Sequence, residues 1–209
     1  TIGNVINPLQ LTEQYPLEAI RYFLMREIPF DYDGDFSHAK FTIRYNADLA
    51  NGLGNLTNRI LAMIEKYCDK TVPAVKNIYH EMVNKLNNVI WPRYNHAMEE
   101  FAFNRALDET WKFITYCDQI ISDKKPWELY KLEKTAELND LLHHLAEALH
   151  HIAIMIWPVM PETAEKIFIQ LGLDVSAELK KSLSELQNWA QLMVGKKINK
   201  GEPLFPRLN

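Results

Sequence analysis

Hydrophobic positions follow a helical period along most of the chain. The clearest case is residues 46–66, NADLANGLGNLTNRILAMIEK, where apolar side chains recur at steps of three and four. Such spacing places the apolar side chains in one stripe along a helix and indicates that this stripe is buried. The stripe consists of Leu49, Leu53, Leu56, Ile60, Met63 and Ile64.

The same period occurs on both sides of this segment. Asn7 and Ser37 are predicted N-caps, because their side chains can accept hydrogen bonds from the free N–H groups of a first helical turn. No stretch alternates apolar and polar residues for long enough to indicate a strand. The sequence therefore predicts an all-α fold, a helix bundle preceded by a short helical segment. Its further helices are expected after residue 7 and over 16–28, 37–49, 78–90, 103–122, 136–157, 162–171 and 184–193.

Glycine and proline predict where these helices are interrupted. Gly52 and Gly54 lower the helix propensity, so a bend or break is expected between residues 51 and 55. Pro92 has no backbone N–H to donate, which predicts a kink or a restart beside it. Residues 122–131, SDKKPWELYK, are expected to form a loop whose backbone is restricted by its proline.

Composition places the chain among globular proteins of ordinary polarity. It has 209 residues, 47% of them hydrophobic, and a formal net charge of -4. This charge argues against non-specific coating of nucleic acid, DNA included, which draws its affinity from many Lys and Arg contacts to phosphate. A small, specific RNA site remains compatible with it. No apolar run approaches the roughly 20 residues that span a bilayer, so no membrane partner is expected.

One polar pair lies on the best-defined helix. Asn55 and Arg59 are four residues apart and therefore share a helix face. An amide both donates and accepts hydrogen bonds, whereas a guanidinium only donates, in a rigid fork, so together they can bind a planar polar edge such as that of a nucleobase. The structural alternative is that Asn55 bonds locally and Arg59 forms an exposed ion pair.

Trp127 stands in the predicted loop beside Lys124 and Lys125. An exposed indole can stack on an unpaired base, with the lysines near the phosphates. The alternative is that Trp127 folds back onto the bundle as a hydrophobic anchor.

Two groups of residues suggest metal sites, both of them weakly. His144, Glu147 and His151 share a helix face at steps of three and four, as zinc ligands can. Partly exposed histidines at the edges of a buried stripe explain the same spacing, and this interpretation is preferred. Residues 31–35, DYDGD, resemble part of a calcium loop but lack its closing glutamate. No metal ligand is therefore predicted, and the two cysteines, Cys68 and Cys117, are expected to be free thiols.

Catalytic motifs are absent from the sequence. There is no GxxxxGK[ST], no GxGxxG after a strand, no GxSxG and no HExxH. The residues alone therefore predict a binding or scaffolding module without catalytic residues or a bound cofactor.

Several long motifs, in order, resemble the methionyl-tRNA synthetase family. TIGNVINP at residues 1–8 resembles the segment that follows the family's Lys-Met-Ser-Lys-Ser loop, and LEAIRYFLMREIPFDYDGDFS resembles its stem-contact region. RYNADLANGLGNLTNR resembles the start of its anticodon-binding bundle, and WPVMPETAEKIFIQLG and EPLFPR resemble later parts. The resemblance implies a stem-contact region over 1–36 and an anticodon-binding helix bundle with a C-terminal tail over 37–209.

This resemblance also implies a function. Asn55 and Arg59 match the pair that recognises the first base, cytosine, of the CAU anticodon, and Trp127 matches the tryptophan that stacks on an anticodon base. The expected partners are methionine tRNA and a catalytic domain of the same parent chain, which would hold ATP and magnesium. The segment alone is expected to be non-catalytic, and the parent cytoplasmic, with an organellar origin left open.

Two other interpretations are compatible with the sequence. The chain could be the anticodon domain of another class I synthetase, or a helical protein-interaction module that does not bind RNA. In the second case Asn55, Arg59 and Trp127 would be structural.

Overall fold

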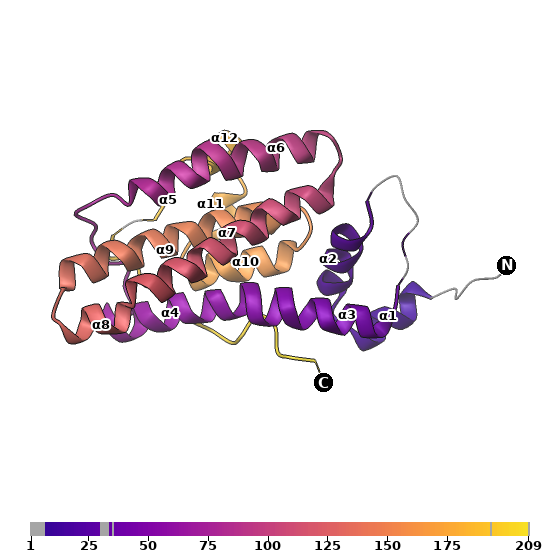
Figure 1. Cartoon of the computed structure of the whole chain (residues 1–209), viewed down its shortest axis with the longest axis horizontal. Coiled ribbons are helices and arrows are strands. Elements are labelled where there is room, and N and C mark those ends of the chain that lie inside the picture. Colours follow the sequence, from indigo (N-terminus) through magenta and orange to yellow (C-terminus); the bar gives the residue numbers. More distant parts are fainter. Residues whose placement is uncertain (1–6, 30–33, 35, 193, 209) are drawn as a thin grey trace.

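The described part of the chain is a bundle of helices. The computed structural model describes residues 7–29, 34, 36–192 and 194–208. Within these residues the only β pairing is an isolated antiparallel bridge between Thr71 and Lys197. Figure 1 shows the long helices side by side, with three N-terminal helices at one end of the bundle. The predicted all-α fold is therefore confirmed.

Helices at the N-terminal end begin where the polar caps predict. α1 (Pro8–Gln14) follows Asn7, whose side chain accepts from the N–H of Leu9 at 3.0 Å. α2 (Leu17–Glu27) comes next, and α3 (His38–Arg44) follows Ser37, whose hydroxyl accepts from the N–H of Lys40 at 3.2 Å. Both caps satisfy N–H groups that the first turn of a helix leaves free.

The break predicted between residues 51 and 55 is not found. α3 continues as the π-helix η1 (Tyr45–Gly54), and η1 continues as α4 (Asn55–Tyr67) with right-handed helical angles at the junctions. A π turn brings the carbonyl of residue i under residue i+5. A Cβ on Gly54 would lie 2.9 Å from the carbonyl oxygen of Leu49, so glycine permits this turn instead of ending the helix.

A second π segment lies where Pro92 predicted an interruption. α5 (His80–Lys85) continues as η2 (Leu86–Ile90) and then as α6 (Trp91–Glu99), with Pro92 in the first turn of α6. The interruption is thus a change of helix type at Trp91, with right-handed helical angles on either side.

Two predicted segments differ from the structure. α7 (Phe103–Lys124) extends into residues 122–131, and Lys125, with φ 45°, then turns the chain into α8 (Pro126–Lys131), so most of the predicted loop is helical. In the described part of 184–193, which ends at residue 192, the only helix is α12 (Leu183–Leu186), preceded by α11 (Val175–Glu178). Pro126 starts α8 because a first helical position needs no N–H donor.

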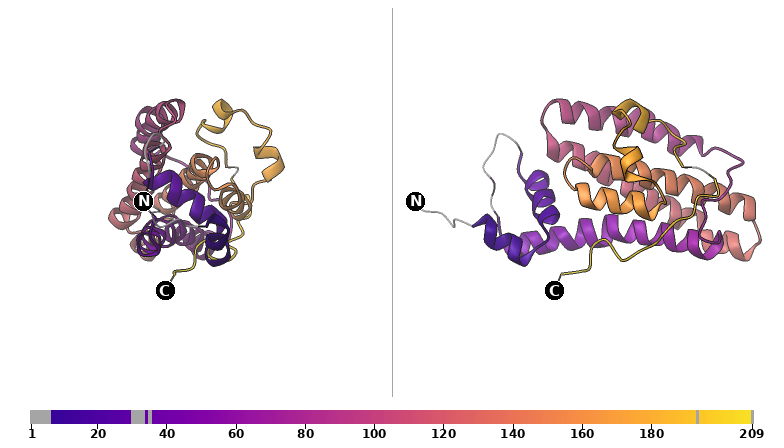
Figure 2. Two further views of the ribbon diagram at one scale, coloured as in Figure 1. Left: turned by 90° about the vertical axis from the view of Figure 1, so that its right-hand side faces the viewer. Right: turned by 180° about the vertical axis from the view of Figure 1, so that it is seen from behind.

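α9 (Thr135–Ile156) is the central helix of the bundle. Every residue from 140 to 156 is buried. It packs against α4, α7, α8 and α10 (Pro161–Gln170). Figure 2 shows the bundle from two further directions. A helix that is buried all round has an apolar circumference, and polar residues on it need partners from neighbouring segments.

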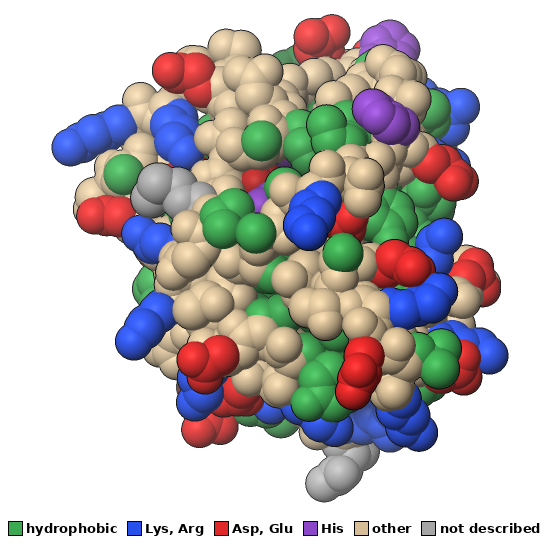
Figure 3. All heavy atoms as spheres, turned by 90° about the vertical axis from the view of Figure 1, so that its left-hand side faces the viewer, with side chains coloured by type: hydrophobic (Ala, Val, Ile, Leu, Met, Phe, Trp, Pro, Cys, Tyr) green, Lys and Arg blue, Asp and Glu red, His purple; other side chains and the backbone are tan. Residues whose placement is uncertain are grey.

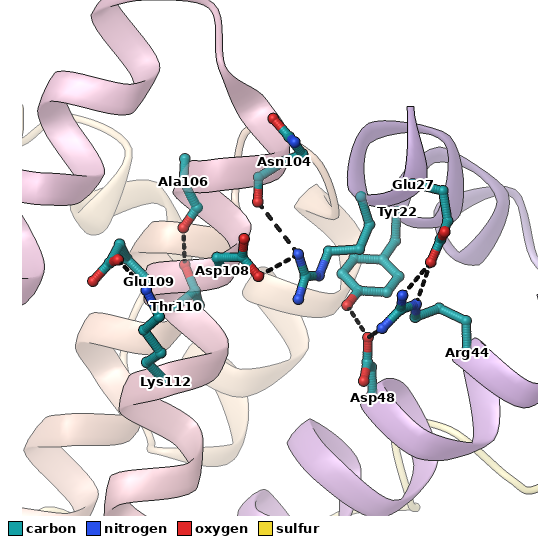
Figure 4. A network of polar contacts seen from close by, with 11 residues as sticks. Tyr22, Glu27, Arg44, Asp48, Asn104, Ala106, Asp108, Glu109, Thr110 and Lys112 are labelled. Carbon is teal, nitrogen blue, oxygen red and sulfur yellow. Dashed lines mark hydrogen bonds and ion pairs between the residues drawn. The ribbon is translucent and has the colours of Figure 1, made fainter. Parts of the chain in front are cut away.

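α2 is attached to the bundle through polar contacts as well as apolar ones. Arg26 forms an ion pair of 2.5 Å with Asp108 of α7, and the Tyr22 hydroxyl donates to Asp48 of η1 at 2.6 Å (Figure 4). Burial, and then the charge of Asp48, raise the pKa of Tyr22 well above its usual value. The Glu18 carboxylate accepts from the N–H groups of residues 162 and 163 at the start of α10. The predicted boundary after residue 36, between the stem-contact region and the helix bundle, stays a prediction.

Replacing Gly54 by alanine tests the π turn. Alanine would raise the helix propensity by about 1 kcal/mol in an ordinary helix. Here its Cβ would meet the carbonyl oxygen of Leu49, so Gly54→Ala should lower the free energy of unfolding by about 1–3 kcal/mol. Urea unfolding measures it, with exposed Asn58→Ala as the control on the same helix. A Gly54→Ala chain as stable as its parent would contradict the π geometry.

Candidate nucleic-acid interface

Asn55 and Arg59 lie on one face of α4. Asn55 is the first residue of α4, directly after the π-helix, and its side chain is exposed. Within the described residues no protein group bonds the Asn55 amide, so its donor and acceptor are both available to a ligand. The structural alternative for Asn55, a hydrogen bond from its side chain to a nearby residue, is therefore not found among the described residues.

Arg59 is held by an acidic residue of the neighbouring helix. Its Nη1 donates to Oδ1 of Asp118, on α7, at 2.5 Å. The Arg59 side chain keeps 32% of its surface exposed, and that of Asp118 keeps 27%. The ion-pair alternative is therefore present in the structure. The pair uses one of five N–H donors of a rigid fork, which leaves the others to bind an acceptor.

Asp118 carries a carboxylate in a half-buried position. Burial raises its pKa, and the charge and hydrogen bond of Arg59 oppose that shift. The ion pair thus favours the charged form of Asp118 and restricts the Arg59 side chain, so that less rotamer freedom is lost when it binds a ligand.

Trp127 stands at the start of α8, with 40% of its surface exposed. The buried residue here is Pro126, which attaches the start of α8 to the bundle. The indole is therefore partly available for stacking and is not a fully buried anchor.

The structure brings two of the three predicted site residues together. Asn55 and Arg59 share the face that borders α7, whereas Trp127 follows the end of α7, nine residues beyond Asp118. Among the described residues no hydrogen bond or ring contact joins Trp127 to the other two. Tyr67, at the end of α4, contacts Tyr130 of α8 with ring centroids 4.5 Å apart, so α4 and α8 meet at this end of the bundle (Figure 1).

The four histidines of α9 are buried, so the expectation that they are partly exposed is wrong. His143, His144, His150 and His151 have at most 4% of their surface exposed. The connector before α5 and the chain after α12 cover His143, His144 and His151, and the Trp189 ring stacks on the His151 ring with centroids 5.3 Å apart. Phe168 of α10 and Glu178 of α11 cover His150. The sequence pattern of α9 does not reveal this cover, because it comes from distant segments.

His144 uses both ring nitrogens within the protein. Its Nδ1 contacts the carbonyl oxygen of Asp140 at 2.7 Å, and its Nε2 accepts from the N–H of Tyr79 at 3.1 Å. The candidate set His144, Glu147 and His151 therefore does not converge on one point. Burial lowers the pKa of His144, which keeps the ring neutral.

Glu147, His150 and His151 do converge, with possible ligand atoms within 4.8 Å of one another. The indole N–H of Trp91 donates to Nδ1 of His151 at 3.4 Å. Burial, followed by His150, lowers the pKa of His151 to about 3, so the ring is neutral and carries its proton on Nε2. Within the described residues Oε2 of Glu147, Nδ1 of His150 and Nε2 of His151 are buried without a hydrogen-bond partner. Ligation of a metal through Nε2 of His151 would place the proton on Nδ1, where the Trp91 N–H now donates, so no metal site is assigned to this cluster.

The remaining sequence candidates add no chemistry to this interface. Residues 31, 33 and 35 of the suggested calcium loop lie outside the described residues. Cys68 and Cys117 are free thiols, and burial raises the pKa of Cys68 to about 11, which makes it unreactive. No helix in the described ranges has the length and apolar content to cross a membrane.

Two family models match the chain. The model described as "tRNA synthetases class I (M)" matches residues 1–61, and "Anticodon-binding domain of tRNA ligase" matches residues 79–200, more than half of the sequence. The chain belongs to the anticodon-binding domain family of tRNA ligases. The expectation of an anticodon-binding helix bundle is thus confirmed.

Known relatives of this anticodon-binding domain are methionine–tRNA ligases. That of Enterococcus faecalis is 44% identical over 99% of this chain, and that of Bacillus subtilis 41% identical over 99%. The chain spans 31% of the length of each, so it corresponds to about a third of those enzymes. The free methionyl-tRNA synthetase of Mycobacterium tuberculosis matches with a TM-score of 0.88 and 30% identity, over 98% of this chain and 41% of that one. The resemblance to methionyl-tRNA synthetase is confirmed.

Sequence reasoning missed Asp118 and the Tyr67–Tyr130 contact in the anticodon-binding domain. Asp118 lies 59 residues from Arg59, and a single sequence gives no signal that joins the two. The tyrosines were missed for the same reason, because only the fold places α8 against the end of α4.

Asp140 tests whether the buried polar groups of α9 are stabilised by hydrogen bonds from neighbouring segments. It accepts from the backbone N–H of Lys76 at 2.6 Å and from the Asn77 amide at 2.8 Å. Burial raises its pKa, but these bonds outweigh burial and the net shift is downward. A lowered pKa stabilises the fold above the unfolded value of about 3.9, and this contribution is lost as the pH falls below it.

Asp140→Asn should therefore lower the free energy of unfolding by about 1.5–3 kcal/mol at pH 7, because an amide is a weaker acceptor for these N–H groups. Urea unfolding should also show a smaller loss of stability for the variant than for the parent between pH 5 and about 3. Exposed Asp123→Asn is the control. Equal stability of variant and parent at pH 7 would contradict the role of Asp140.

Proposed function

We propose that this chain reads the CAU anticodon of methionine tRNA, with Asn55 and Arg59 binding the first base, cytosine, and Trp127 stacking on it. The observation that carries the proposal is the arrangement on α4. A free amide and a guanidinium oriented by Asp118 share one exposed face, in a chain of the anticodon-binding family. An anticodon loop is single-stranded and can turn its bases outward toward such groups.

The chemistry of the pair favours cytosine over uracil. Cytosine presents acceptors at N3 and O2, which suit the donors of Arg59, and an amino donor at N4, which suits the amide oxygen of Asn55. Uracil has a donor at N3 and an acceptor at O4, so it would leave protein groups unpaired. Each such mismatch costs about 1–3 kcal/mol, and discrimination therefore follows from unsatisfied groups.

Trp127 supplies affinity in this proposal. Its partly exposed ring lies at the end of the bundle where α8 follows α7 and contacts the end of α4 through Tyr130 and Tyr67. Stacking of a base on an aromatic ring contributes about 1–3 kcal/mol and tolerates any base, so the hydrogen-bonding pair on α4 provides the selectivity.

The parent protein is proposed to be a methionine–tRNA ligase that charges this tRNA with methionine. The similar ligases are about three times longer than this chain. Activation of methionine with ATP and magnesium would belong to a catalytic domain outside these residues, and the chain alone is proposed to be non-catalytic. The proposed location is the cytoplasm, and DNA is not a proposed partner.

Trp127→Ala should weaken binding of a CAU anticodon stem-loop by about 5- to 150-fold, which corresponds to about 1–3 kcal/mol of stacking. Trp127→Phe keeps an aromatic face and should retain most of the affinity. Titration at one fixed salt concentration measures both, since affinities at different salt cannot be compared. Unchanged affinity of a folded Trp127→Ala chain would remove stacking from the proposal.

Arg59→Ala should reduce the preference for CAU over UAU stem-loops, because the donors that match cytosine are lost. Arg59→Lys keeps the charge without the planar fork and should also lose preference. Lys66→Ala, which removes a charge from the same helix, is the control. It should lower the affinity for the CAU and UAU stem-loops by the same factor. A ratio of C to U affinities that Arg59→Ala leaves unaltered would exclude Arg59 as the reader.

A further inference from the structure

A groove at the end of the bundle has no role in the function proposed above. It has a volume of about 590 Å³, within the range of about 300–1,000 Å³ typical of small-molecule pockets. The end of α4, α8 and the start of α9 form its walls. The residues that line it are Tyr67, Tyr130, Lys131, Glu133, Thr135 and Leu138.

An exposed aromatic ring forms one side of the groove. Tyr130 keeps 52% of its surface exposed although its ring contacts Tyr67, with centroids 4.5 Å apart and planes inclined by 30°. Tyr67 is half-buried and supports the ring from the bundle side. Tyr130 is thus held by a neighbouring ring while much of its own surface faces solvent, as in a stacking platform for a planar ligand.

The groove adjoins the predicted stacking residue. Trp127 and Tyr130 are three residues apart in α8, so their side chains lie on one face with Cβ atoms about 5–6 Å apart. Both rings are exposed, at 40% and 52%. A single-stranded segment that places one base on Trp127 therefore has a second aromatic platform beside it.

The charges around the groove are mixed, with Glu133 and Lys131 both in its lining, and two lysines offer contacts to a phosphate backbone. Lys131 lines it, and the Nζ of Lys66 lies 5.3 Å from the centroid of the Tyr67 ring. Within the described residues neither lysine has an ion-pair partner. Figure 3 shows the end of the bundle, where Lys and Arg side chains alternate with Asp and Glu around exposed hydrophobic ones. The net charge of -4 is thus compatible with local cationic positions.

We propose that this groove binds a second unstacked base of the same anticodon loop, with Tyr130 as the stacking platform and Lys131 and Lys66 near the adjoining phosphates. The inference rests on the proposed function, because it assigns a further nucleotide to the same RNA. It deepens that function by adding a contact that holds the loop open beside the base bound by Trp127.

A double-mutant cycle tests the assignment. The parent, Tyr130→Ala and Trp127→Ala chains are titrated with the intact CAU stem-loop and with loops in which one nucleotide at a time lacks its base. Tyr130→Ala should lower the affinity for the intact loop by about 5- to 150-fold. One of the loops that lack a single base should bind the parent and Tyr130→Ala with equal affinity. The same loop should still bind Trp127→Ala more weakly than the parent.

Two further variants separate stacking from folding. Tyr130→Phe keeps the ring and should bind like the parent. Tyr130→Leu keeps apolar volume over Tyr67 without an aromatic face and should lose affinity with little change in melting temperature. Phe101→Ala removes an exposed aromatic ring at the opposite end of the bundle and should leave binding unchanged.

The outcomes distinguish this inference from the proposed function. If Trp127→Ala weakens binding and folded Tyr130→Ala and Tyr130→Leu do not, the groove inference fails and the proposed function stands. If variants at both positions bind like the parent, the groove inference fails and stacking by Trp127 is removed from the proposed function, whose reading pair on α4 is tested separately by Arg59→Ala. Two results would overturn the assignment of a second base. In one, Tyr130→Ala lowers the affinity by the same factor for every loop. In the other, the effects of Tyr130→Ala and of Trp127→Ala disappear when the same nucleotide lacks its base.

Discussion

Burial of α9 on all sides is the constraint on which this structure depends. Every residue from 140 to 156 is inside. Six of them are ionisable groups that a core excludes unless they have partners, namely Asp140, His143, His144, Glu147, His150 and His151. Most of the partners come from outside the long helices of the bundle, whereas His151 accepts from Trp91 of α6. Pro73 and Tyr79 bond His143 and His144, Glu178 bonds His150, and the N–H of Leu192 bonds Glu147 at 2.6 Å. The polar residues of α9 therefore determine where two irregular segments lie.

The same helix sets the geometry of the proposed interface. α4, α7 and α8 all pack on α9, so the face with Asn55 and Arg59 and the ring of Trp127 are fixed on one scaffold. The ion pair between Arg59 and Asp118 then restricts the guanidinium, and the rings of Tyr67 and Tyr130 join α4 to α8. A reader of an unpaired base benefits from such order, because side chains that are already positioned lose less entropy on binding.

Local sequence signals predicted much of the fold. The apolar stripes gave α7, α9 and α10 to within two residues at each end, and Asn7 and Ser37 cap α1 and α3 as their residue types indicate. Gly54 misled the prediction because its missing side chain permits a π turn against Leu49, and packing then overrides propensity. Asp118, Tyr130 and the cover over the histidines of α9 depend on residues distant in sequence, which no local period can show.

The central claim is that Asn55, Arg59 and Trp127 hold one base. Nuclear magnetic resonance of the labelled chain during addition of a CAU stem-loop tests it most directly, through the side-chain N–H signals of Arg59 and Trp127. The account predicts that both signals shift with one common affinity, while the buried indole of Trp91 does not. Binding of the loop that leaves the Arg59 and Trp127 signals in place would contradict the account.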